Sequence, residues 1–184
     1  MKAWLGLAFL TIVMGILLFG CAGIFSYWQA WVYLVIFLVS TGLITLHLMK
    51  NNPALLERRV KAGPIAEQET TQKIIQALVS LAFLAIFVVS ALDRRLAWSA
   101  IPFLVVVAGD FLVVVGLYIV FVVFKENAFT SATIEVNKGQ ELITTGLYSK
   151  VRHPMYAGAL IMLLGTPLCF GIVVVFWQFC RWSL

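Results

Sequence analysis

Five long, uninterrupted apolar runs restrict the folds that are open to this chain. A helix needs about 20 residues to cross the hydrocarbon core of a bilayer. Lipid cannot pair with free backbone amide and carbonyl groups, so a spanning segment must be a helix or part of a closed barrel. The runs are continuous and do not alternate with polar residues, which favours helices. The predicted spans are Trp4–Phe25, Trp28–Leu48, Ile74–Leu92, Ile101–Phe124 and Pro154–Trp177.

The composition agrees with a membrane protein. Hydrophobic residues make up 62% of the chain and charged residues 11%, whereas soluble domains have roughly 45–50% apolar and about 25% charged residues. We therefore predict an all-α, polytopic membrane protein that forms one membrane-embedded domain over residues 1–184, with polar connections at 49–73 and 125–153. The net charge of +5 favours contact with anionic membrane lipids over nucleic acid, because few residues lie outside the apolar runs.

The basic residues predict the orientation of the spans. Cytoplasmic connections of membrane proteins carry an excess of Lys and Arg. With a cytoplasmic N-terminus, Arg94, Arg95 and Arg181 lie outside, and the other basic residues lie in the cytoplasm. These other residues are Lys2, Lys50, Arg58, Arg59, Lys61, Lys73, Lys125, Lys138, Lys150 and Arg152. This distribution predicts a cytoplasmic N-terminus and a cytoplasmic 125–153 connection.

The first polar connection, Asn52–Lys73, contains a short amphipathic pattern. Leu55, Leu56 and Val60 are interspersed with charged residues, which suits a helix at the membrane interface. The Gly63-Pro64 pair is expected to end that helix. A solvated linker that touches lipid remains the alternative.

The second polar connection ends in "YSKVRHPMYAG", a cluster of basic and aromatic residues. A turn is expected at residues 137–139, and Gly146 is a second flexible point. Pro154 suits the first position of the last helix, with His153 as its cap. The positive end of that helix then faces the cluster, which favours a carboxylate or phosphate ligand. The alternative is that these residues only anchor the chain at the membrane surface, namely Tyr148, Lys150, Arg152 and Tyr156.

The cysteines and histidines do not predict a metal site. Cys21, Cys169 and Cys180 lack a paired metal-ligand spacing, and His47 and His153 are far apart in the sequence. There is also no Gly-rich phosphate loop after a strand, which argues against a soluble dinucleotide-binding fold.

The stretch "GLYSKVRHPMYAG" resembles the Gly-x-Tyr-x-x-x-Arg-His-Pro-x-Tyr-x-Gly signature of the isoprenylcysteine carboxyl methyltransferase family, which is related to the phospholipid methyltransferases. The stretches "NPALLERRVKAGP" and "NAFTSATIEVNKGQELITTG" are similar to the bacterial branch of that family, so the resemblance covers most of Asn52–Pro167. It implies a membrane-embedded methyltransferase that uses S-adenosyl-L-methionine, taken from the cytosol, and a lipid-like or prenylated acceptor.

The resemblance also implies the residues of the site. Those expected to contact the cofactor are Gln140, Glu141, Leu142, Ile143, Tyr148, His153, Pro154, Met155 and Tyr156, and those assigned to catalysis are Arg152, His153 and Tyr156. Gln140 departs from the histidine that is usual in the family. Tyrosine faces suit the cofactor's sulfonium through cation–π attraction. A carboxylate acceptor is already ionised at neutral pH, whereas an amine must lose a proton, for which His153 is the nearby imidazole.

The C-terminal part differs from the family pattern. The family carries a pair of glutamates there with an arginine nearby, whereas this sequence has no acidic residue after Glu141 and only Arg181 as a basic residue in its last stretch. A buried ammonium without a charged partner costs several kcal/mol. A C-terminally truncated chain that binds the cofactor weakly, or an inactive membrane protein, is therefore one expectation.

Two further functions remain open at this point. A phospholipid N-methyltransferase would share the cofactor but act on an amine. A membrane sterol-type reductase has a similar Arg-His-Pro-x-Tyr segment and uses a nicotinamide cofactor, but such enzymes usually have more spans than five.

Overall fold

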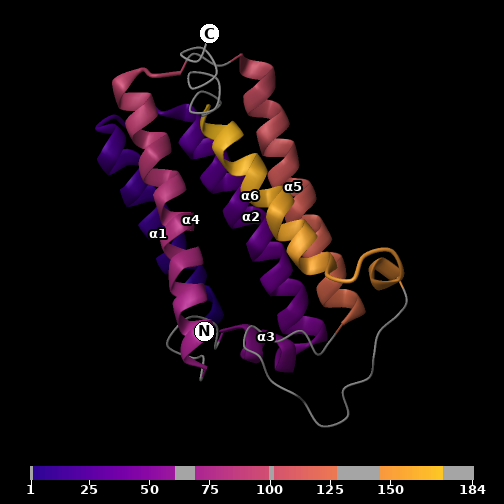
Figure 1. The fold of residues 1–184 in the computed structure, drawn as a ribbon. Helices are drawn as coiled ribbons and strands as arrows, with labels where there is room; N and C mark the ends of the chain where they lie inside the picture. The colour runs from indigo at the N-terminus through magenta and orange to yellow at the C-terminus, as the bar shows by residue number, and fades with distance from the viewer. Residues whose placement is uncertain (1, 61–68, 100–101, 128–145, 172–184) are drawn as a thin grey trace.

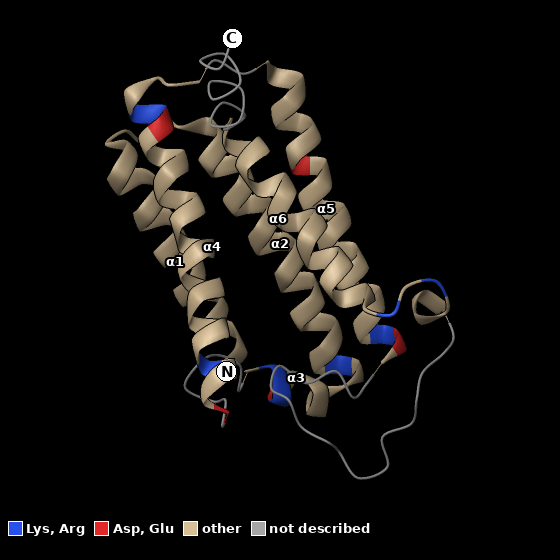
Figure 2. Cartoon of the chain, in the orientation of Figure 1, with Lys and Arg blue, Asp and Glu red and all other residues tan. Residues whose placement is uncertain are grey.

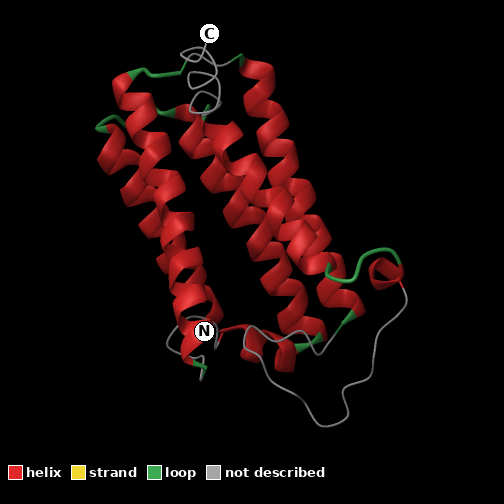
Figure 3. Cartoon of the chain, in the orientation of Figure 1, coloured by secondary structure: helices red, strands yellow, loops and turns green. Residues whose placement is uncertain are grey.

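The structure, a computed structural model, describes residues 2–60, 69–99, 102–127 and 146–171, and these residues form an all-α fold. No strand occurs within the described ranges (Figure 3). The elements follow in the order α1 (Lys2–Ala22), α2 (Trp28–Asn51), α3 (Pro53–Val60), α4 (Thr70–Leu96), α5 (Phe103–Glu126), the 3₁₀ turn η1 (Gly146–Ser149) and α6 (Pro154–Phe170). The predicted fold class is therefore confirmed.

Four of the helices, α1, α2, α4 and α5, are long and apolar enough to cross a membrane. The fifth predicted span begins at Pro154 as expected, but the helix ends at Phe170 and not at Trp177. Gly171 ends it by adopting a left-handed conformation with a φ of 92°, and its amide donates to the carbonyl groups of Leu168 and Pro167. This is a usual way to end a helix, because glycine has no Cβ to oppose it. Residues 172–184 lie outside the described part.

The surface of the bundle is apolar along the helices. Phe9, Leu81, Leu104 and Phe111 are between 65% and 77% exposed, and they come from α1, α4 and α5. Soluble proteins rarely expose so much continuous apolar surface. These side chains suit contact with lipid tails, and they support an integral membrane protein.

In Figure 1, α1 lies beside α4, and α2 lies beside α5 and α6. α1 and α2 form a hairpin, α4 packs on α1, and α6 packs along the length of α5. A buried aromatic cluster joins α2, α4 and α6: the ring of Phe170 lies 4.8 Å from that of Tyr33 and 5.9 Å from that of Phe87. Aromatic pairs of this kind contribute roughly 0.5–1.5 kcal/mol beyond the area that they bury. This cluster holds the last described turn of α6 in the bundle.

Glycines set the close approach of α5 and α6. A Cβ added to Gly116 would lie 2.6 Å from the carbonyl oxygen of Gly158, and one added to Gly165 would lie 2.8 Å from that of Gly109. Small residues allow such backbone contact between membrane helices, where dispersion forces replace the hydrophobic effect. Gly158 is also the last glycine of the signature, so the packing of α6 explains this position of the motif.

The short helix α3 packs under the ends of the longer helices. Leu55 is fully buried and lies in a second apolar cluster with Leu48 and Phe124. Asn52 caps the helix, since its side-chain oxygen accepts a hydrogen bond of 3.1 Å from the amide of Leu55. The helix predicted from the amphipathic pattern is confirmed, and the burial of Leu55 argues against a merely solvated linker. The predicted end at Gly63-Pro64 lies outside the described residues.

Most of the basic residues gather at the end of the bundle that carries α3 and η1 (Figure 2). The described members of this group are Lys2, Lys50, Arg58, Arg59, Lys73, Lys125, Lys150 and Arg152, whereas Arg94 and Arg95 end α4 at the opposite side. The predicted separation of charge thus appears in the fold. That the basic end faces the cytoplasm stays a prediction.

Candidate functional site

The described part of the signature begins with the turn η1, close to the C-terminal end of α5. Gly146 adopts a φ of 61° there, so the flexible point predicted from the sequence is a left-handed residue. The hydroxyl of Ser149 donates to the carbonyl of Gly146 at 2.7 Å, and the amide of Lys150 donates to the carbonyl of Leu147 at 3.1 Å. The turn is therefore closed by its own hydrogen bonds.

Two residues at the end of α5 hold this turn. The amide of Leu147 donates to a carboxylate oxygen of Glu126 at 2.9 Å. The side-chain amide of Asn127 donates to the hydroxyl of Tyr148 at 3.1 Å. The prediction from the sequence missed both residues. The available signal was Glu126, an acidic residue close to the end of an apolar run.

The start of α6 agrees with the prediction. Pro154 is its first residue and is buried, and His153 occupies the N-cap position, where its carbonyl accepts from the amide of Ala157 at 3.2 Å. The predicted cap position is therefore confirmed, although the imidazole itself makes no capping hydrogen bond. The ring instead packs beside Tyr156, with 5.7 Å between the ring centroids.

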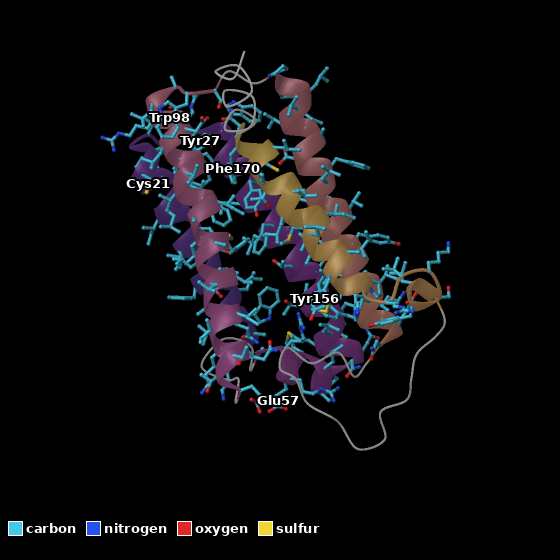
Figure 4. All side chains as sticks on the ribbon, in the orientation of Figure 1. Cys21, Tyr27, Glu57, Trp98, Tyr156 and Phe170 are labelled. Carbon is cyan, nitrogen blue, oxygen red and sulfur yellow. The ribbon has the colours of Figure 1, made fainter. Side chains whose placement is uncertain are left out.

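The remaining predicted residues differ in exposure. Arg152, His153 and Tyr156 are exposed, and the exposed fraction of Tyr156 is 71%. Figure 4 places Tyr156 near the end of the bundle where Glu57 of α3 lies, away from Tyr27 and Phe170. Met155 is partly buried and packs on the cluster of Leu48, Leu55 and Phe124. The other predicted contacts, Gln140, Glu141, Leu142 and Ile143, lie outside the described residues.

Cations and aromatic rings are paired at this end of the bundle. The guanidinium of Arg59 lies 4.9 Å from the ring centre of Phe124, and the ammonium of Lys125 lies 5.8 Å from that of Phe121. Burial lowers the pKa of the Arg59 guanidinium from its ordinary value, because the low-dielectric surroundings disfavour the charged form. Arg59 thus connects α3 to the end of α5 that holds η1.

Two hollows lined by described residues lie away from the signature. One of about 470 Å³ is at the opposite end, beside Gln29, Asp93 and Arg94. An apolar groove of about 240 Å³ lies between α2 and α5, beside Leu43 and Phe121. Neither is lined by a described residue of the signature.

The described residues of the signature are of types that suit the charged groups of S-adenosyl-L-methionine, the expected cofactor. Tyr156 offers an exposed ring to a sulfonium. Arg152 and the first amides of α6 suit a carboxylate, because a helix N-terminus leaves free N–H groups and a positive dipole end. The residue types of the segment therefore suit an anionic group and a soft cation.

The fold and this segment define a multi-span α-helical membrane protein with a polar site at one end of the bundle. Residues 104–184 match the family of phospholipid methyltransferases, a range that includes nearly all of α5 and the whole of η1 and α6. The match confirms the family resemblance predicted from the signature and supports a membrane methyltransferase in general. Comparison with curated proteins found no match. Comparison with solved structures found none either.

Proposed function

We propose that this chain transfers a methyl group from S-adenosyl-L-methionine to a lipidic or prenylated carboxylate in the membrane. The observation that carries the proposal is the family match over residues 104–184, which includes the turn η1 and the start of α6. Methyltransferases of this family usually use that cofactor, which supplies an electrophilic methyl group when bound.

The residues of this chain contribute binding and alignment. We propose that the sulfonium contacts the rings of Tyr148 and Tyr156, the two tyrosines of the signature. Carboxylate groups of the cofactor or the acceptor are proposed to contact Arg152 and the N-terminus of α6. Methyl transfer is an in-line displacement, so orienting the two reactants and excluding water account for most of the catalysis. A lipidic acceptor can approach from the bilayer, since the site lies where the apolar helices end.

An anionic acceptor suits the described charges. Lys150 and Arg152 are exposed beside the N-terminus of α6, and the sequence from Gly146 to Gly171 contains no acidic residue. The carboxylate of Glu126, which reaches this segment from α5, already accepts a hydrogen bond from the amide of Leu147. A carboxylate is attracted by these cations and needs no general base. The second candidate, N-methylation of an amine phospholipid, is favoured by the description of the matched family. In that reaction His153 is the proposed base, because its imidazole is exposed and follows Arg152 directly.

A binding experiment and a transfer assay test the proposal. The purified protein in nanodiscs should bind S-adenosylhomocysteine in calorimetry and should not bind a reduced nicotinamide dinucleotide. A radiolabelled methyl assay should then give product with a prenylcysteine and little with phosphatidylethanolamine. Product only from the amine lipid would favour the second candidate, and binding only of the dinucleotide would point to the reductase class.

A further inference from the structure

We propose that Glu126 is a positioning residue of the candidate site: its carboxylate holds the turn η1 and thereby sets the orientation of Tyr148. This inference rests on the proposed methyltransferase function, in which Tyr148 contacts the cofactor. Glu126 is the last residue of α5, and its hydrogen-bond partner Leu147 lies 21 positions later in the sequence.

The first support is the hydrogen bond itself. The amide of Leu147 donates to the carboxylate of Glu126 at 2.9 Å, and the carboxylate is partly buried. Hydrogen bonds to a charged acceptor are roughly twice as strong as those between neutral groups. The bond satisfies an amide at the start of η1, where no intrahelical acceptor is available.

The second support is the shape of the backbone at Gly146. Its φ of 61° and the absence of a Cβ let the chain come close to the carboxylate, and an added Cβ would overlap the side chain of Glu126. The first glycine of the signature is thus explained by contact with Glu126.

The third support is a parallel contact from the next residue. Asn127 donates to the hydroxyl of Tyr148 at 3.1 Å, so two successive residues hold the backbone and the ring of the same turn. With its hydroxyl oxygen accepting from Asn127, the half-buried Tyr148 is held at one edge of its ring.

The end of α5 is a firm support for these contacts. Val123 and Phe124 are buried, and Arg59 of α3 lies over the ring of Phe124. The other end of the segment is held as well, because α6 packs on α5 through Gly116 and Gly158. Both ends of the described signature are therefore attached to α5, and Glu126 provides the attachment at the N-terminal end.

Calorimetry with S-adenosylhomocysteine can separate this role from a simple charge effect. Glu126→Ala should weaken binding about tenfold, equivalent to about 1.4 kcal/mol. Glu126→Gln keeps an acceptor for the amide of Leu147, and its affinity should stay within about threefold of the wild type. Glu57→Ala, which removes an exposed acid of α3, is the matched control and should bind normally. Wild-type affinity in Glu126→Ala, or equal losses in both Glu126 variants, would overturn the inference.

Hydrogen exchange provides a readout that does not depend on the cofactor. The amide of Leu147 should exchange faster in Glu126→Ala than in the wild type, and Glu126→Gln should retain most of the protection. If the wild type failed to bind S-adenosylhomocysteine, the proposed function would be rejected, while exchange at Leu147 would still decide whether Glu126 holds the turn. Unchanged exchange in Glu126→Ala would reject the positioning role by itself.

Discussion

Replacing Gly116 by alanine tests whether backbone contact between α5 and α6 holds the start of α6 in place. The added Cβ would lie 2.6 Å from both the carbonyl oxygen of Gly158 and the amide nitrogen of Met162. Both neighbours are backbone atoms, so they cannot move aside as the end of a flexible side chain can. The two helices must therefore separate locally.

The expected cost follows from these distances. Ordinary contact begins at 3.4 Å, so the helices must move apart by about 0.8 Å at this point. Overpacking of this kind costs roughly 1–3 kcal/mol. Alanine regains up to about 1 kcal/mol of helix propensity over glycine. Because both clashing atoms belong to the backbone, we expect a cost in the upper part of that range, about 2–3 kcal/mol, and hence a net loss of about 1–2 kcal/mol in the free energy of unfolding.

Unfolding in mixed micelles with increasing dodecyl sulphate, followed by far-ultraviolet circular dichroism, measures this free energy. Gly20→Ala is the matched control, because Gly20 is an exposed glycine in α1 and its added Cβ meets nothing within 4 Å. The control should be as stable as the wild type or slightly more so. If Gly116→Ala were equally stable, the close packing of α5 and α6 would not exist in the membrane protein.

Three further predictions concern the site, the topology and α3. Tyr156→Ala should weaken binding of S-adenosylhomocysteine by roughly 1–3 kcal/mol through loss of an aromatic contact, as measured by calorimetry, whereas Lys2→Ala should leave it unchanged. In intact cells an impermeant thiol reagent should label the Trp98→Cys variant, because Trp98 is 51% exposed at the end of the bundle opposite the signature. The same reagent should not label the Ser149→Cys variant. The reverse labelling pattern would show that the orientation is inverted. Arg59→Ala should lower the free energy of unfolding by about 1–2 kcal/mol, because it removes a partly buried cation over an aromatic ring, and a loss no larger than that of Lys2→Ala would contradict this role.

The sequence by itself determined the features that depend on local composition. The apolar runs predicted the membrane helices, because partition between water and lipid depends on the residues of each segment. Pro154 predicted the first residue of α6, since proline suits the start of a helix. The pattern around Leu55 predicted α3, and the signature predicted the family resemblance that residues 104–184 show.

Only the tertiary structure showed how these parts are attached to one another. The contact of Glu126 with Leu147 and that of Asn127 with Tyr148 each join residues 21 positions apart. The pairing of Gly116 with Gly158 depends on the register of two antiparallel helices. Hydropathy is a property of each residue by itself and therefore does not define which residues of two helices meet. Packing does define it, because it depends on the shape of each residue and on the backbone groups that the residue leaves accessible.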